Sequence, residues 1–216
     1  MFFWLIFCYF VIQRLIRAIM STELNFDFFK VNYDKIAPKQ GSVIIAEPGL
    51  IDLNFKRSVI LLVEHNENGT IGFVLNRILN YNLSDLLPDF PDFDAKISLG
   101  GPVSPKSIHF IHTLGDVVPK TTHIIDNIYW GGDFEYIKSL IIAKKITSKQ
   151  ILFFVGYSGW SVEQLDREIV EGSWVVTQLH PIQIFTGIED LWINTVRQLG
   201  TNFKPWTLYP EDPSFN

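Results

Sequence analysis

A serine between two glycines is the first group in this sequence that could do chemistry. Residues 151–165 read ILFFVGYSGWSVEQL, an apolar β-rich stretch, then Ser158, then what the pattern predicts to be the start of a helix. A strand, a tight turn and a helix with a serine in the turn form the outline of a hydrolase nucleophile elbow. The elbow needs small residues on both sides of the serine, but Trp160 stands two positions after it. The sequence therefore predicts that Ser158 is not a nucleophile, and we assign no catalytic residue.

The same stretch has a structural interpretation. Gly156 and Gly159 would permit a tight turn between strand and helix, and Ser161 would cap the helix. On this interpretation Gly159→Val prevents folding, because a β-branched side chain does not readily adopt the positive φ that such a turn needs.

A second group of candidate residues is polar. Two β-rich segments are joined at Asn68-Gly69, a dipeptide typical of tight hairpin turns, and we expect them to pair antiparallel. Five polar residues lie near the ends of this predicted hairpin: Glu64, His65, Asn66, Asn76 and Arg77. Cross-strand pairing could bring several of them together to bind a ligand or partner, or to do acid–base chemistry. The alternative is a solvated hairpin with an Arg77 to Glu64 ion pair worth under about 1 kcal/mol.

Histidines and glycines give two further patterns. His109 and His112 are three positions apart on a predicted strand, so they point to opposite faces and we expect no metal site. Gly100 and Gly101 offer unhindered backbone N–H groups that could contact a ligand, and we include them, with the neighbouring Pro102, as candidate binding residues. No GxxxxGK[ST] or GxGxxG motif occurs, so nucleotide binding is disfavoured and no cofactor is expected.

These residues must be positioned by a mixture of strands and helices. Apolar, β-branched segments predict strands within 41–47, 57–65, 70–77, 96–101, 107–113, 151–155 and 173–179. Helical spacing and capping residues predict helices within 83–90 (capped by Ser84), 133–146 (capped by Asp133), 161–172 and 188–200. Strands arrive as hairpins and helices come late, a pattern that favours an α+β fold over regular βαβ alternation.

Charge and cysteine content exclude some classes of function. The net charge is −5, so no general basic field attracts a phosphate backbone and direct nucleic-acid binding is not expected. The only cysteine is Cys8, which excludes an internal disulfide and fits a reducing compartment such as the cytoplasm.

The first 19 residues are a hydrophobic extension of doubtful status. Their uninterrupted apolar run, 2–12, is shorter than the roughly 20 residues of a membrane span and lacks the features of a signal peptide. We expect translation to begin at Met20 and residues 20–216 to form one domain; membrane contact is expected only if residues 1–19 are part of the protein.

Three ordered sequence blocks resemble the YqgE/AlgH family of bacterial proteins. The blocks read PGLIDLNFKRSVILLVEHNENGTIGFVLNR, LGGPVSPKSIHFIHT and GYSGWSVEQLDREIVEGSW. Relatives usually have Pro at the positions of Leu53 and Ile78, and Gly is common at that of Glu163. The resemblance implies a cytosolic single domain with a twisted, largely antiparallel, partly barrel-like sheet flanked by helices. It implies an association with transcriptional regulation but no settled biochemical activity.

Together these observations favour a non-catalytic regulatory or protein-binding domain that acts on transcription indirectly, through an unknown protein partner or small ligand. The alternative is a small-molecule hydrolase that uses the polar cluster around Glu64, His65 and Arg77.

Overall fold

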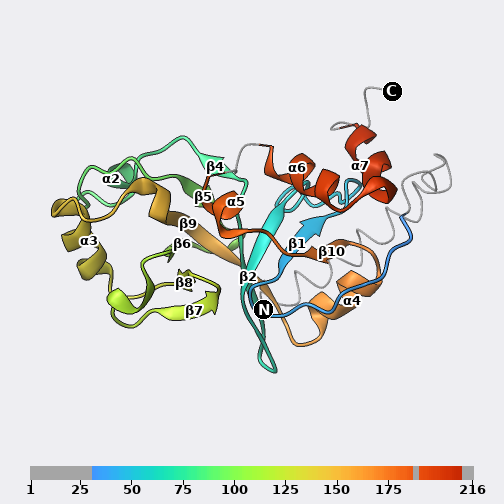
Figure 1. Cartoon of the computed structure of the whole chain (residues 1–216), viewed down its shortest axis with the longest axis horizontal. Coiled ribbons are helices and arrows are strands. Elements are labelled where there is room, and N and C mark those ends of the chain that lie inside the picture. The colour runs from blue at the N-terminus through green and yellow to red at the C-terminus, as the bar shows by residue number, and fades with distance from the viewer. Residues whose placement is uncertain (1–30, 187–189, 211–216) are drawn as a thin grey trace.

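The computed structural model of the chain describes residues 31–186 and 190–210, and it shows one large sheet with helices packed against it (Figure 1). The strands are β1 (Val43–Ala46), β2 (Val59–Asn66), β3 (Gly69–Val74), β4 (Ile78–Leu79), β5 (Ile97–Leu99), β6 (Val103–His112), β7 (Thr122–Ile125), β8 (Ile128–Trp130), β9 (Ile151–Trp160) and β10 (Trp174–Thr177). The helices are α2 (Leu83–Leu86), α3 (Phe134–Ile142), α4 (Gln164–Val170), α5 (Pro181–Thr186), α6 (Leu191–Gln198) and α7 (Lys204–Leu208), with 3₁₀ turns at Gly115–Val117, Ser148–Gln150 and Thr201–Phe203. None of the helices in the described ranges is long and apolar enough to cross a membrane. The predicted extension, 1–19, lies outside the described residues.

The sheet is antiparallel except at one pair of strands. Its main path runs β10-β1-β2-β3-β9-β6-β8-β7, while β5 pairs in parallel with β9, and β4 pairs antiparallel with β5. The path has two ends, at β10 and β7, so the sheet is not closed into a complete barrel. The α+β fold class predicted from the sequence, with helices flanking a largely antiparallel sheet, is confirmed.

The central strand β9 divides the apolar core because its side chains alternate between faces. Leu152 and Phe154 enter the cluster that packs against α5, α6 and α7, whereas Ile151 and Phe153 enter the cluster beneath α3. In Figure 1, β9 accordingly lies between one half that contains α2 and α3 and another that contains α4 to α7. A third cluster lies beneath α4.

The hairpin predicted around Asn68-Gly69 is confirmed, with one change in its turn. β2 pairs antiparallel with β3, and Asn66 lies opposite Gly69. The two loop residues are therefore Glu67 and Asn68, and Gly69 is the first residue of β3, with φ 128°.

Helix starts agree with the sequence in one case and differ in two. Asp133 caps α3 as predicted, since its carboxylate accepts a hydrogen bond from the amide of Tyr136 at 3.0 Å. The predicted cap Ser84 is wrong, because α2 begins at Leu83 and Asn82 is its cap. Helix α4 begins at Gln164 rather than directly after Ser161.

Candidate functional site

Ser158 lies inside a strand, not in a turn. β9 continues from Ile151 through Trp160, and Ser158 is the cross-strand partner of Gly72 on β3. Its side chain is fully buried, and its hydroxyl donates to the carbonyl of Gly100 at 3.0 Å. The strand–turn–helix outline drawn from the sequence is therefore wrong, since residues 158–160 pair with β3 as part of the strand. The hydroxyl holds β9 against the segment that follows β5.

Ser158→Ala is expected to lower the free energy of unfolding by only about 1 kcal/mol, the usual value of one internal hydrogen bond. The Gly100 carbonyl also accepts from the amide of Val74 at 3.0 Å, so it keeps a partner in the variant. Urea denaturation of both proteins measures the difference. Covalent labelling of wild-type Ser158 by a fluorophosphonate would contradict this structural role.

The predicted binding glycines pack against β9. A Cβ atom on Gly100 would come within 2.4 Å of the Gly156 carbonyl oxygen, and one on Gly101 within 2.4 Å of Ser158 Oγ. The amide of Gly100 donates to the carbonyl of Val155 at 2.9 Å, so it is not directed at a ligand. These glycines permit close approach between two segments, while Pro102 is exposed beside them.

The polar residues near the turn of the hairpin make local hydrogen bonds. Asn66 Nδ2 donates to Glu64 Oε1 at 2.8 Å, and Asn66 Oδ1 accepts from the amide of Asn68 at 2.8 Å. His65 Nδ1 lies 2.7 Å from Thr70 Oγ1 on the opposite strand. Glu64 and Asn66 therefore form one local pair near the tip of the hairpin, whereas His65 pairs with Thr70 on the opposite strand.

Asn76 and Arg77 lie at the other end and secure the loop before β2. Asn76 accepts from the amide of Val59 and donates to the carbonyl of Arg57, each at 2.9 Å. The Arg77 guanidinium donates to the carbonyls of Leu53 and Lys56, also at 2.9 Å. Burial lowers the pKa of Arg77, and the nearby carboxylate of Asp52 acts in the opposite direction.

The hairpin therefore separates the residues that the sequence interpretation placed together. Arg77 comes six positions after Ile71, the cross-strand partner of Glu64, which corresponds to roughly 20 Å of extended chain. In place of the Arg77 to Glu64 ion pair of the alternative interpretation, Arg77 donates hydrogen bonds to two backbone carbonyls. A hydrolase site built from Glu64, His65 and Arg77 would need these groups in one place, and the structure does not bring them there.

Three exposed aliphatic residues are connected to Arg77 through the backbone. The amide of Leu99 donates to the carbonyl of Arg77 at 2.8 Å, which sets β5 beside this residue. Leu53 is 76% exposed, and Ile78 and Leu99 are partly exposed as well. We call this group, Leu53, Arg77, Ile78 and Leu99, the Arg77 surface.

The two histidines of β6 lie on opposite faces, as predicted. His109 contacts the rings of Phe73 and Tyr157, whereas His112 lies with Thr121 and Gly131 on the other side. Burial lowers the pKa of both. Over the part of the chain that the structure describes, no group of three or more His, Cys, Asp or Glu side chains is placed to hold a metal ion.

One buried acid was missed by the sequence interpretation. Glu168 on α4 is 6% exposed, and its carboxylate accepts hydrogen bonds from the indole N–H groups of Trp160 and Trp174 at 2.9 and 2.8 Å. Gln164 donates to its other oxygen at 2.9 Å. The four-residue spacing of Gln164 and Glu168 predicts that they meet on one helix face. The sequence does not show that Trp160 on β9 and Trp174 on β10 also meet there.

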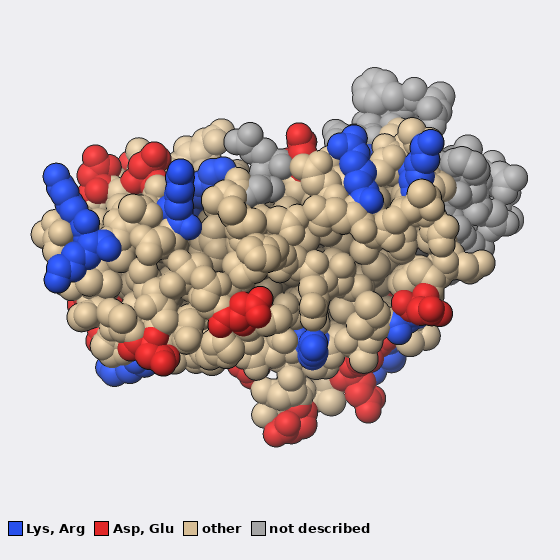
Figure 2. Space-filling view, viewed as in Figure 1, with Lys and Arg blue, Asp and Glu red and all other residues tan. Residues whose placement is uncertain are grey.

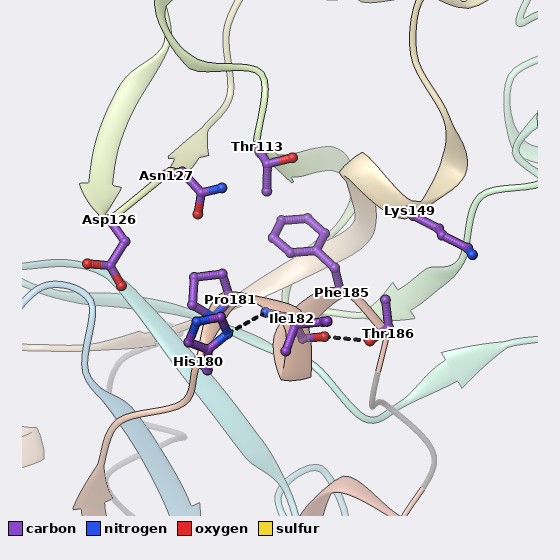
Figure 3. Close-up of a pocket in the computed structure, with 9 residues that line it drawn as sticks. All are labelled: Thr113, Asp126, Asn127, Lys149, His180, Pro181, Ile182, Phe185 and Thr186. Carbon is purple, nitrogen blue, oxygen red and sulfur yellow. Dashed lines mark hydrogen bonds between the residues drawn. The ribbon is translucent and has the colours of Figure 1, made fainter.

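The sequence interpretation also missed a cavity of about 620 Å³. Its lining comes from the end of β6, the β7–β8 turn, the 3₁₀ turn before β9, and α5 with the residue before it (Figure 3). We call it the α5 cavity; its lining residues are Thr113, Asp126, Asn127, Lys149, His180, Pro181, Ile182, Phe185 and Thr186. These segments are distant in the sequence, so only the folded chain brings them together.

Comparison with known proteins establishes the relatives of this chain. A family model described as AlgH-like matches residues 43–204, which include the hairpin, the Arg77 surface and β9. The chain belongs to the AlgH-like family. The resemblance seen in three blocks of the sequence is thereby confirmed.

Individual AlgH-like relatives match along nearly their whole length. A UPF0301 protein of Parabacteroides distasonis is 42% identical over 193 residues, which cover 88% of this chain and 98% of the relative. One from Chlorobium limicola is 38% identical over 185 residues, covering 85% and 98%. The solution structure of the AlgH protein from Pseudomonas aeruginosa is similar, with a TM-score of 0.63 and 28% identity over 78% of this chain and 94% of that one. A crystal structure of the protein DIP2367 from Corynebacterium diphtheriae gives a TM-score of 0.67 at 26% identity, covering 82% and 94%.

Proposed function

We propose that this AlgH-like chain is a non-catalytic regulatory domain that binds a partner protein through the Arg77 surface. The observation that carries the proposal is the 76% exposure of the Leu53 side chain on a loop whose carbonyl groups bind the Arg77 guanidinium. Ile78, the next residue in the chain, and Leu99, whose amide donates to the Arg77 carbonyl, are exposed as well. Exposed aliphatic side chains next to an arginine are typical of protein interfaces, where arginine is enriched.

The geometry around Arg77 supports recognition by a fixed surface. Two backbone carbonyls hold the guanidinium, so little side-chain freedom is lost when a partner contacts it. Leu53 follows Asp52, whose side chain is buried and accepts a hydrogen bond from the amide of Asn54 at 2.8 Å, and this turn holds the loop that presents Leu53.

An effect on transcription would be exerted through this partner. The net charge is −5, and on the face seen in Figure 2 lysine and arginine side chains are separated and interspersed with acidic ones. That face presents no continuous basic stripe of the kind that neutralises nucleic-acid phosphates. A cytoplasmic location is part of the same proposal and is supported by the low cysteine content.

Leu53→Asp tests the proposal with little risk to folding, because the side chain is 76% exposed. We expect it to weaken binding of the partner at least tenfold, since a carboxylate replaces an aliphatic contact at an interface centre. The partner is first identified by cross-linking and mass spectrometry, then purified, and its dissociation constant is measured for each variant.

The matched control is Val170→Asp at the end of α4, where valine is 71% exposed and where Figure 1 places the helix away from β4. It should leave both the affinity and the melting temperature unchanged. Equal affinities for wild type and Leu53→Asp, with both proteins folded, would show that the Arg77 surface is not the binding site.

A further inference from the structure

The α5 cavity has walls that are fixed by hydrogen bonds outside it. The amide of Thr113 donates to the carbonyl of Gln150 at 3.0 Å, which holds the end of β6 against the turn that carries Lys149. The ring of His123 lies 2.9 Å from the carbonyl oxygen of Asp126 across the β7–β8 turn. The volume of about 620 Å³ lies within the range of roughly 300 to 1,000 Å³ typical of small-molecule sites.

The middle of the cavity is apolar. Phe185 belongs to the large core cluster and is almost fully buried, so its position is set by packing. In Figure 3 its ring lies among the other lining groups, next to Pro181 and Ile182. This arrangement suits a short aliphatic side chain on a ligand.

The two ends of the cavity carry opposite charges. Figure 3 shows Asp126 on one side of Phe185 and Lys149 on the other. Asp126 is exposed on a tight turn, with φ 49°, while Lys149 is exposed on the turn before β9. In Figure 3 the Lys149 side chain extends outward from Phe185, so its ammonium group lies at the rim of the cavity. The lysine stem is flexible, and its rotation brings the ammonium group to a ligand that spans the cavity from Asp126.

Neutral polar groups between these ends supply hydrogen bonds. Nδ1 of His180 accepts from the amide of Ile182 at 3.3 Å, so Nε2 carries a hydrogen and is a donor. The hydroxyl of Thr186 donates to the carbonyl of Ile182 at 2.6 Å, which leaves its oxygen to accept. Asn127 and Thr113 line the opposite wall, and their side chains both donate and accept.

We propose that the α5 cavity binds a short peptide with both termini free, its ammonium group at Asp126, its carboxylate at Lys149 and an apolar side chain over Phe185. The N–H and C=O groups of a peptide can pair with the donors and acceptors along the walls. The α5 cavity shares no residue with the Arg77 surface. A negative result at one site therefore does not contradict the proposal for the other.

The tripeptide Ala-Leu-Ala is the probe, titrated into isotopically labelled protein and followed by amide chemical shifts. We expect saturable shifts confined to the segments around Thr113, Asp126, Lys149 and 180–186. Acetylation of the peptide amine, or amidation of its carboxylate, should each weaken binding about three- to tenfold, because one charge contact at a partly exposed site is lost.

Two variants then test which side chain contacts each terminus of the peptide. Asp126→Asn should bind the free and the acetylated peptide equally, while still preferring the free carboxylate over the amide. Lys149→Gln should show the reverse pattern. Asp94→Asn and Lys145→Gln are the matched controls, since both residues are exposed and neither lines the cavity, and they should behave like wild type.

Three results would overturn the proposal. The first is the absence of saturable shifts at millimolar peptide. The second is a set of shifts centred away from the cavity. The third is equal sensitivity of both variants to both blocked peptides, which would indicate general charge attraction rather than an oriented ligand.

Discussion

Gly156→Val is expected to prevent stable folding. Gly156 has φ 66°, in the left-handed region that β-branched residues avoid. A Cβ atom there would lie 2.7 Å from the carbonyl oxygen of Gly101 and 2.8 Å from that of Val103. Both neighbours are backbone atoms and cannot move aside without disturbing the pairing of β6 with β9. We expect a loss of roughly 4 kcal/mol or more, a large share of the about 5 to 15 kcal/mol that stabilises a typical domain.

Gly159→Val is the matched control on the same strand. Gly159 is exposed, its φ lies outside the left-handed region, and an added Cβ would make only an ordinary contact of 3.4 Å with the Tyr157 ring. The sequence interpretation, which expected misfolding at this position, chose the wrong glycine, because it placed a turn where β9 continues.

Circular dichroism and urea denaturation of the two variants measure the difference, with Gly156→Ala providing a value if the valine variant does not fold. Gly156→Val and Gly159→Val with unfolding free energies within about 1 kcal/mol of each other would contradict the assigned backbone geometry.

Local features could be predicted from this sequence. The hairpin follows from Asn68-Gly69 between two apolar segments, and the start of α3 follows from Asp133, because the residues responsible are neighbours in the chain. The opposite orientation of His109 and His112 follows from strand alternation alone.

Features that depend on distant segments could not be predicted. The sequence around Gly156 and Ser158 is typical of a turn. Only the structure shows that these residues belong to β9, which pairs with β3 and with β6. Glu64 and Arg77 looked close because both flank a hairpin, but its length along the strands sets them apart. The α5 cavity likewise needs four separate segments, and nothing in the sequence indicates that they meet.

Glu168→Ala is the second variant expected to have a large effect. It removes the acceptor shared by the indole N–H groups of Trp160 and Trp174 and leaves both donors buried without it. Each stranded donor costs about 1 to 3 kcal/mol. We therefore expect the free energy of unfolding to fall by roughly 3 to 5 kcal/mol. Asp166→Asn, an exposed acid on the same helix, should change it by less than about 0.5 kcal/mol.

Glu168→Gln distinguishes the charge of this side chain from its shape. Its carbonyl oxygen can still accept from both indoles, but its NH₂ group faces the NH₂ of Gln164. Gln164 cannot simply rotate, because its oxygen already accepts from the amide and hydroxyl of Ser161 at 3.0 and 3.1 Å. We expect an intermediate loss of about 1 to 2 kcal/mol.

The pH dependence of stability follows from the same burial. Desolvation raises the pKa of Glu168 above its ordinary 4.5, although hydrogen bonds from Gln164, Trp174 and Trp160 act in the opposite direction. The folded protein then binds this proton more tightly than the unfolded chain, so the contribution of Glu168 to stability decreases as pH rises from about 4.5 through the folded-state pKa. Glu168→Gln does not titrate, and its stability measured against wild type should therefore improve with pH across that window. Urea denaturation of both proteins at a series of pH values tests this, and a difference that stays constant or changes in the opposite direction would show that the folded site favours the ionised carboxylate.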